Sequence, residues 1–185
     1  EYRRIDAVDK VTGRAKYAED IVMPDMLHGK VLRSPHHHAR LLTLDKTQAE
    51  KLAGVMLVIT AADIPGENGL GDYSRDEPIL TPLGDTAKML GAPIAIVVAE
   101  TPQQAQAGAE AIQVSYEVLP HVFDTDEALA ENAYPIYSRG NILTQFQVKH
   151  GDLDEAFDHS DLILETRYRS AFVEHSALER EASLA

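Results

Sequence analysis

Three adjacent histidines are the residues of this chain whose type and spacing most directly suggest chemistry. His36, His37 and His38 stand within "LRSPHHHARLLTLD", residues 32–45, in a chain of 185 residues that has 8 histidines and no cysteine. A neutral imidazole binds zinc, copper or nickel, and it transfers protons near neutral pH. The segment is therefore a candidate metal site, a candidate catalytic cluster or a part of the scaffold.

The spacing of these histidines favours the scaffold. In an extended strand, His36 and His38 point to one face and His37 points to the other, so at most two of them can share an ion. A structural zinc ion takes about four ligands and a catalytic one about three. Further ligands would have to be carboxylates or the remaining histidines, which show no ligand spacing: His28, His121, His150, His159 and His175. We predict a structural role and no metal site, with opportunistic metal binding as the alternative.

A second group of titratable residues stands near the end of the chain. "FVEHSALERE", residues 172–181, follows a strand-like run and contains Glu174, His175, Glu179 and Glu181. Glu174 and His175 have the residue types of a proton-transfer pair, and His175 and Glu179 are spaced as neighbours on a helix. Capping and salt-bridge roles are favoured by the same spacing, and the proton-transfer role stays open.

Two further patterns have structural explanations. "GENGLG", residues 66–71, lacks the preceding strand, the following helix and the lysine of a phosphate-binding loop, so we expect a mobile loop. The acidic pairs Asp124 with Asp126 and Asp152 with Asp154 each stand at a predicted helix start. Carboxylates at such positions cap backbone amides and meet the positive end of the helix dipole.

The composition is typical of a globular protein that binds neither nucleic acid nor membranes. The chain is 44% hydrophobic and 25% charged, and its net charge of -13 disfavours contact with a phosphate backbone or anionic lipid. No apolar run approaches the roughly 18–20 residues of a membrane span, and no signal-peptide pattern opens the sequence. The lack of cysteine excludes thiolate zinc sites, iron–sulfur ligation and disulfides from these residues. We expect a cytoplasmic location.

The local sequence predicts two strand–helix–strand units. Asp45 to Gln48 form a capping-box pattern before a short helix over about 46–53, which Gly54 would end. Thr101 and Pro102 start a second helix. Strand-like runs flank both helices, at residues 39–44, 55–59, 94–99 and 114–118. Because the helices are too short for parallel crossovers, we expect an α+β fold with mixed sheets.

The pattern changes along the rest of the chain. Residues 63–85 are rich in Gly, Pro and Asp and read as a long irregular connection. A domain boundary is expected within 119–140, and short helices are expected after Asp124 and Asp152. Strands are predicted over 142–148 and 162–172.

"VTGRAKYAEDIVMPDMLHGKVLRSPHHHARLLTLD", residues 11–45, closely resembles the start of the molybdopterin-binding large subunit of the xanthine dehydrogenase and aldehyde oxidase family. The similarity continues in the same order through "GVMLVITAADIPGENGLG", "GAPIAIVVAETPQQAQAGAEAIQVSYEVLP", "GNILTQFQVKHGDLDEAF" and "YRSAFVEHSALERE". It implies an α/β hammerhead domain over 1–120, with a linker and the incomplete start of the molybdopterin-binding domain over 121–185. Because the chain begins at Glu1 and stops after a strand-like run, we expect an N-terminal fragment.

The resemblance also implies an activity for the complete protein. Such enzymes are oxidoreductases that hydroxylate aldehydes, purines or other N-heterocycles with a molybdopterin cofactor, and pass electrons to iron–sulfur clusters and FAD on other domains or subunits. Their catalytic glutamate and glycine-rich cofactor segments lie beyond the part that these 185 residues resemble. The fragment is thus expected to be inactive, with no catalytic residue and no cofactor of its own. Its implied partners are the rest of its subunit, the iron–sulfur and FAD subunits and further copies of the enzyme.

One position of this chain matches a residue beside the family's cofactor. In the xanthine dehydrogenase members a glutamine precedes the Glu-His pair, and the matching residue here is Val173. Valine cannot donate the glutamine's hydrogen bond, so the segment is more similar to the divergent bacterial members. The alternative function is a stand-alone hammerhead-type binding or interaction module that uses residues 63–85 as its contact surface.

Overall fold

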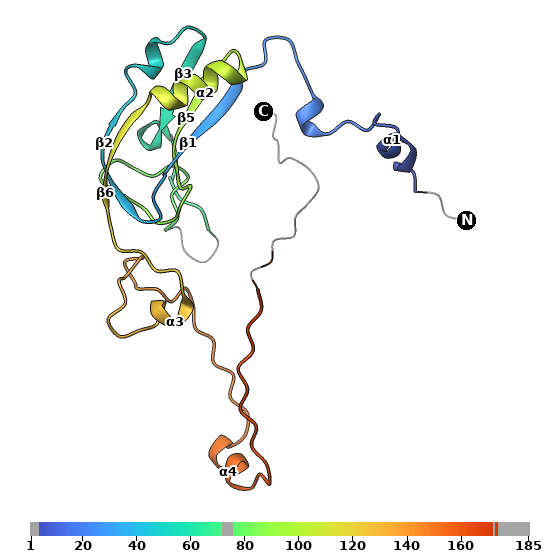
Figure 1. Ribbon diagram of the computed structural model, residues 1–185, viewed down its shortest axis with the longest axis vertical. Helices are drawn as coiled ribbons and strands as arrows, with labels where there is room; N and C mark the ends of the chain where they lie inside the picture. Colours follow the sequence, from blue (N-terminus) through green and yellow to red (C-terminus); the bar gives the residue numbers. More distant parts are fainter. Residues whose placement is uncertain (1–3, 72–75, 172, 174–185) are drawn as a thin grey trace. The chain divides into compact units, whose positions relative to one another are not determined.

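The structure is a computed structural model that describes residues 4–71, 76–171 and 173. The internal contacts of the chain define two units. The larger unit is Pro24–Leu143, and the smaller one combines Glu1–Met23 with Thr144–Ala185 (Figure 1). The helices and sheets that give the fold its class all belong to the larger unit.

Runs of β-branched and aliphatic residues form the first of two three-stranded sheets. Its strands are β1 (His28–Arg33), β5 (Pro93–Ala99) and β3 (Val55–Thr60), in the order β1-β5-β3. Both pairings are antiparallel, with Lys30 and Val58 each opposite Val97 of the central strand. The strand β1 does not figure among the predicted strands, whereas β3 and β5 agree with the predicted runs to within one residue.

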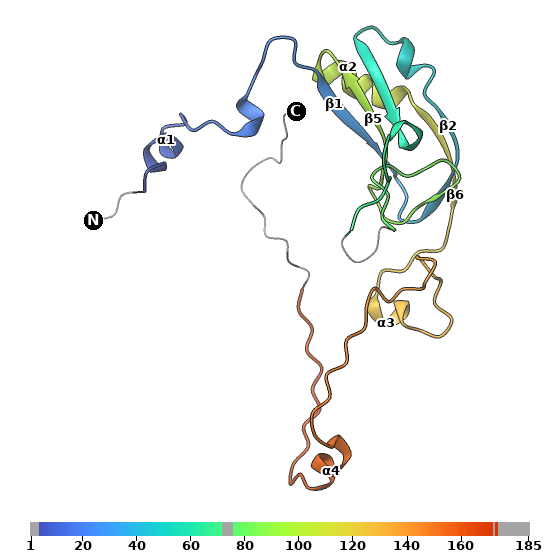
Figure 2. The ribbon, with the colours of Figure 1, turned by 180° about the vertical axis from the view of Figure 1, so that it is seen from behind.

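The second sheet contains β4 (Thr86–Ala87), β2 (Ala39–Asp45) and β6 (Gln113–Val118), in the order β4-β2-β6. These pairings are antiparallel too, and Ala39 lies opposite Val118 at one end of the β2–β6 ladder. The ribbons of β2 and β6 lie side by side in Figures 1 and 2. The predicted α+β class is confirmed, with antiparallel sheets in place of mixed ones.

The two strand–helix–strand units explain why the strands that the structure describes pair without a parallel ladder. The strand β2 leaves the second sheet and reaches β3 of the first sheet through the 3-10 turn η2 (Ala49–Lys51). The strand β5 leaves the first sheet and reaches β6 of the second through α2 (Pro102–Ala111). Each unit therefore passes from one sheet to the other instead of crossing back over its own sheet.

The two predicted helix starts have different outcomes. At α2, the Thr101 hydroxyl accepts a hydrogen bond of 3.2 Å from the Gln104 amide, and Pro102 occupies the first turn as predicted. The predicted helix over 46–53 is wrong in length, because only η2 is helical there. The Asp45 carboxylate accepts from the Thr47 amide at 2.9 Å and one helical bond follows, from the Glu50 amide to the Lys46 carbonyl at 3.0 Å, but the chain leaves helical geometry at Leu52.

Small side chains let α2 lie close against the first sheet. Ala105, Gly108 and Ala109 are its buried residues, and Val97 and Val58 are buried on the strands. Ala109, Val97 and Val58 belong to one core cluster, together with Ala49, Ala95 and Ile112. A second cluster, of Leu41, Ala87, Ala92 and Ile94, joins strands and loops of both sheets. The close approach of helix and sheet is thus the basis of the larger core.

Short helices outside this core are capped as the acidic pairs predict. Asp124 caps α3 (Thr125–Ala128) and Asp152 caps α4 (Leu153–Asp158), each by accepting from the amides two and three residues ahead. The remaining short helical segments are α1 (Ala7–Val11), η1 (Ala18–Asp20) and η3 (Ala61–Asp63). No helix within the described ranges is long and apolar enough to cross a membrane.

The strands predicted over 142–148 and 162–172 are wrong for the residues that the structure describes. From Thr144 to Ala171 the chain forms α4 and no strand. Apolar side chains here remain exposed, including Phe146 at 80% and Tyr168 at 89%. The alternating pattern therefore marks side chains that the described part of the chain does not bury. Phe172 lies outside the described residues.

We predict that Gly108→Ala lowers the free energy of unfolding by about 1 kcal/mol. A Cβ atom at Gly108 would lie 2.7 Å from Val97 Cγ1 and 3.1 Å from Val55 Cγ2. Overpacking of this kind costs about 1–3 kcal/mol, which exceeds the gain of about 1 kcal/mol in helix propensity. Gly66→Ala is the matched control, because its Cβ meets nothing within 4 Å. Chemical denaturation that shows equal stability for both variants would contradict the packing argument.

Candidate functional site

The three histidines lie in a bend and not on a strand. The strand β2 begins at Ala39, after the bend over residues 35–38. The buried Ser34 hydroxyl accepts a 3.1 Å hydrogen bond from the His36 amide, which turns the chain around Pro35. The predicted placement of the three histidines on a strand is thus wrong, because their backbone bends here. Each ring instead contacts a different residue further along the chain.

His38 is the buried member and holds the segment that follows β6. Its side chain is 3% exposed, and its Nδ1 lies 2.5 Å from the carbonyl oxygen of Pro120. Because a carbonyl only accepts, His38 donates through Nδ1. The Leu119 amide donates to the His38 carbonyl at 2.9 Å, and the ring of Tyr134 meets the His38 ring edge-on at 5.5 Å. The predicted structural role is confirmed for this histidine.

The other two histidines take part in exposed or half-buried ring contacts. The His36 ring packs edge-on against Tyr116 of β6, with centroids 4.9 Å apart. The His37 ring lies 4.7 Å from Phe123 and 5.7 Å from His121, while the rings of His121 and Phe123 are 4.5 Å apart. Other histidines were considered above as possible partners of His36, His37 and His38. Among the described contacts, it is His121 that lies beside them.

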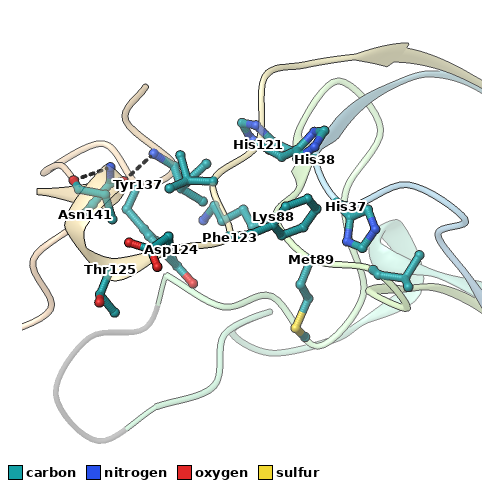
Figure 3. Close-up of a pocket in the computed structure, with 14 residues that line it drawn as sticks. His37, His38, Lys88, Met89, His121, Phe123, Asp124, Thr125, Tyr137 and Asn141 are labelled. Atoms are coloured by element: carbon teal, nitrogen blue, oxygen red, sulfur yellow. Dashed lines mark hydrogen bonds between the residues drawn. The ribbon is translucent and has the colours of Figure 1, made fainter. Parts of the chain in front are cut away.

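An open cavity of about 370 Å³ lies beside these rings (Figure 3). It is bounded by the histidine bend, by the loop after β4 and by the chain from His121 to Asn141. Its lining includes the rings of His37, His121 and Phe123 and the apolar side chains of Met89, Leu90, Val122 and Ile136. The cavity is therefore a feature of the segment that follows the second sheet.

Two polar side chains of this cavity, Lys88 and Asn141, are engaged within the protein. The Lys88 ammonium donates to the Asp76 carbonyl at 2.7 Å and lies 4.6 Å from the centre of the Tyr137 ring. The Asn141 amide nitrogen donates to the carbonyls of Ala128 and Tyr134, at 3.1 and 3.0 Å. The Asn141 bonds close the loop after α3, and both the Asn141 amide and the Lys88 ammonium are held by backbone carbonyls.

Tyr137 is a hydrogen-bond donor at the edge of the cavity. Its hydroxyl donates to a Glu77 carboxylate oxygen at 3.3 Å. Burial raises the pKa of Tyr137, and the negative charge of Glu77 raises it further. Tyr137 therefore stays protonated near neutral pH and serves as a donor.

Among the residues that the structure describes, no group of three or more His, Asp or Glu side chains is placed to hold a metal ion. The predicted cofactor position, Val173, is 81% exposed, and its role beside a cofactor stays a prediction. Glu174, His175, Glu179 and Glu181 lie outside the described residues. In the predicted loop over 66–71, Asn68 exchanges two hydrogen bonds with the Leu80 backbone, at 2.7 and 3.0 Å.

The sequence did not predict the ring partners of the triple histidine. Tyr116, Phe123 and Tyr134 are scattered over the chain and show no spacing that relates them to residues 36–38. The one local signal of a change in chain direction was Pro120, just after the strand pattern of β6 ends. The ring contacts depend on the antiparallel pairing of β2 with β6, which local patterns do not specify.

The fold has two antiparallel sheets, and each strand–helix–strand unit runs from one sheet to the other, with α2 packed on the first sheet. This arrangement is an α/β hammerhead domain. The family model described as "Aldehyde oxidase and xanthine dehydrogenase, a/b hammerhead domain" matches residues 12–120. The chain therefore belongs to the aldehyde oxidase and xanthine dehydrogenase family, as its sequence resemblance predicts.

Similar proteins extend beyond this domain. The chain is 39% identical to a probable xanthine dehydrogenase subunit of Bacillus subtilis (strain 168), over 98% of this chain and 24% of that protein. It is 36% identical to the nicotinate dehydrogenase large molybdopterin subunit of Eubacterium barkeri, over 98% of this chain and 42% of that protein. The crystal structure of quinoline 2-oxidoreductase from Pseudomonas putida 86 matches with a TM-score of 0.75 at 32% identity, over 85% of this chain and 21% of that one. The chain thus spans less than half the length of these relatives.

We predict that His38→Ala lowers the free energy of unfolding by about 1–3 kcal/mol. The substitution removes the bond to Pro120 and the ring contact with Tyr134, and it opens a gap at a buried position. His38→Asn places an amide nitrogen where Nδ1 stands, so it is expected to retain part of the stability. His159→Ala, at an exposed histidine, is the control. Urea midpoints that are the same for His38→Ala and the control would refute the structural role.

Proposed function

We propose that this chain is the N-terminal part of the large subunit of a molybdenum hydroxylase, an oxidoreductase that acts on aldehydes or aromatic N-heterocycles. The alignment carries the proposal: relatives match along 98% of this chain, and this chain covers about a quarter of the Bacillus subtilis protein. Residues 1–120 are assigned to the hammerhead domain. Residues 121–185 are assigned to a linker and the start of the molybdopterin-binding domain, which agrees with the end of the family match at residue 120.

The names of the relatives support the substrate class. Nicotinate and quinoline, which appear in two of them, are aromatic N-heterocycles. Val173, in place of glutamine, favours a substrate that needs no hydrogen bond from that position. The substrate pocket itself belongs to sequence beyond the matched part of the family.

The described residues do not fit a molybdopterin cofactor. A pterin with a phosphate group needs several free backbone or side-chain donors, as helix N-termini and glycine-rich loops supply. In the cavity beside the histidines, the amide of Asn141 and the ammonium of Lys88 already donate to backbone carbonyls, and Asp124 adds negative charge. We therefore assign the cofactor to the rest of the subunit, with iron–sulfur clusters and FAD on other domains or subunits, and derive no catalytic step from these residues.

The role of this part is then to supply a rigid scaffold to the complete enzyme. Its partners would be the rest of the subunit, the iron–sulfur and FAD subunits and a second copy of the assembly, in the cytoplasm. The names of the similar proteins identify them as subunits, which supports such an assembly. The alternative of a stand-alone module predicts a stop codon soon after residue 185, whereas the proposal predicts a coding sequence that continues with a glycine-rich cofactor segment and a late glutamate.

We predict that the 185-residue chain, purified from a host that makes molybdopterin, carries no stoichiometric molybdenum and does not hydroxylate purines. The reason is that the Lys88 ammonium and the Asn141 amide of its cavity already donate to backbone carbonyls. Elemental analysis and a turnover assay check this, with a complete family enzyme from the same host as the positive control. One molybdenum per chain, or turnover, would show that the chemistry is assigned to the wrong part of the protein.

A further prediction concerns the segment 144–171. Its apolar side chains are exposed, including Leu164 at 81% and Phe146 at 80%, so the isolated chain should self-associate as its concentration rises. Leu164→Lys should weaken this association, because it places a charge on the exposed apolar run. Glu165→Lys, at a residue that is already charged, is the control. Light scattering that shows a clean monomer at high concentration would contradict the prediction.

A further inference from the structure

Hydrogen bonds of the neighbouring residues hold His37 and His121 close together. The residues next to them in sequence, His38 and Pro120, are joined by the Nδ1–carbonyl hydrogen bond, and the Leu119 amide donates to the His38 carbonyl. This double link fixes the separation of the two chain segments at that point. As a result, the rings of His37 and His121 lie with centroids 5.7 Å apart and planes inclined by 36° (Figure 3).

Both imidazoles are accessible to a ligand. His37 and His121 are exposed, and among the described residues their interactions are ring contacts with one another and with Phe123. His38 and His159, by comparison, use Nδ1 in hydrogen bonds to carbonyl groups. The ring nitrogens of the His37–His121 pair are therefore available to bind an ion.

The ring centres are close enough for a shared metal ion, which requires rotation of the exposed side chains that turns one nitrogen of each ring towards the ion. An imidazole nitrogen binds a divalent transition metal at about 2.0–2.1 Å, which places the ring centre about 3 Å from the ion. Two imidazoles on one ion consequently have centres less than about 6 Å apart. The value of 5.7 Å satisfies this limit, and the net charge of -13 favours the approach of a cation.

We propose that His37 and His121 form a two-imidazole site for a divalent transition metal ion, with water completing the coordination. Two protein ligands make this an exchangeable site, unlike a structural zinc centre with four. Copper(II) should bind most tightly, because affinities of nitrogen ligands for first-row metals peak at copper. The site departs from the prediction that this chain holds no metal, and it is independent of the proposed enzyme function.

A bound ion would add a second link to the one that His38 makes. It would connect the bend before β2 with the segment after β6, on the side of the sheet where the chain leaves the hammerhead domain. Because the site exists only when these segments are folded together, the ion should stabilise the folded chain by mass action.

Copper(II) titration of the chain without a polyhistidine tag tests the site. We expect one ion per chain, electron paramagnetic resonance coupling to two nitrogens, and a rise in melting temperature with added copper. The variants His37→Phe and His121→Phe keep an aromatic ring in each position and remove its ligand nitrogens. Each should weaken copper binding about tenfold or more and abolish the thermal shift, whereas His159→Phe should change neither.

The outcomes separate the proposal from adventitious binding. Melting curves without metal show whether each variant is folded, and circular dichroism spectra compare their secondary structure with that of the wild type. Equal copper affinity in His37→Phe or His121→Phe and the wild type would overturn the proposal. So would an equal loss in His159→Phe, or coupling to one nitrogen only.

Discussion

The hydrogen bond from His38 to Pro120 is the interaction on which the end of the hammerhead domain depends. In the β2–β6 ladder Ala39 lies opposite Val118, and the Leu119 amide extends this pairing by one step to the His38 carbonyl. Pro120 has no N–H group, so the backbone cannot continue the ladder. The Pro120 carbonyl accepts from the imidazole of His38, a side chain, and not from a backbone amide of a neighbouring strand. A buried histidine thus ends a sheet and fixes the direction of the chain that leaves it.

The rest of the site follows from this fixed point. Because Pro120 is held at the end of β6, the following residues turn back over the histidine bend, and His121 and Phe123 reach His37. Further along, Tyr134 packs on His38. The cavity therefore results from the folding of residues 121–141 against the second sheet, and its apolar rings and engaged polar groups are consistent with scaffold and binding roles.

Local patterns predicted the features that depend on neighbours in sequence. Thr101 and Pro102 start α2 where the sequence indicates, and Asp124 and Asp152 cap the short helices that follow them. The helix after Asp45 was overestimated, because its carboxylate forms the same local bond but the chain becomes extended at Leu52. Local signals favour caps and turns alike, and the surrounding packing decides between them.

Features that depend on distant residues could not be predicted in this way. The bend at the histidines is set by Ser34, but the partners of their rings are set by the register of β2 against β6. The alternating run over 162–172 has the pattern of a strand, yet a strand needs a partner, and none pairs with it among the residues that the structure describes. The family resemblance supplied the hammerhead assignment that neither periodicity nor spacing could give, and the family match confirmed it.

The central claim is that His38 is a structural donor and not a ligand or a catalyst. The most direct test is a long-range ¹H–¹⁵N correlation spectrum of the histidine rings in alkaline buffer, where imidazoles are neutral. The structure predicts that His38 carries its proton on Nδ1, because that atom faces a carbonyl oxygen. A ring protonated on Nε2, with an unprotonated Nδ1, would contradict the account.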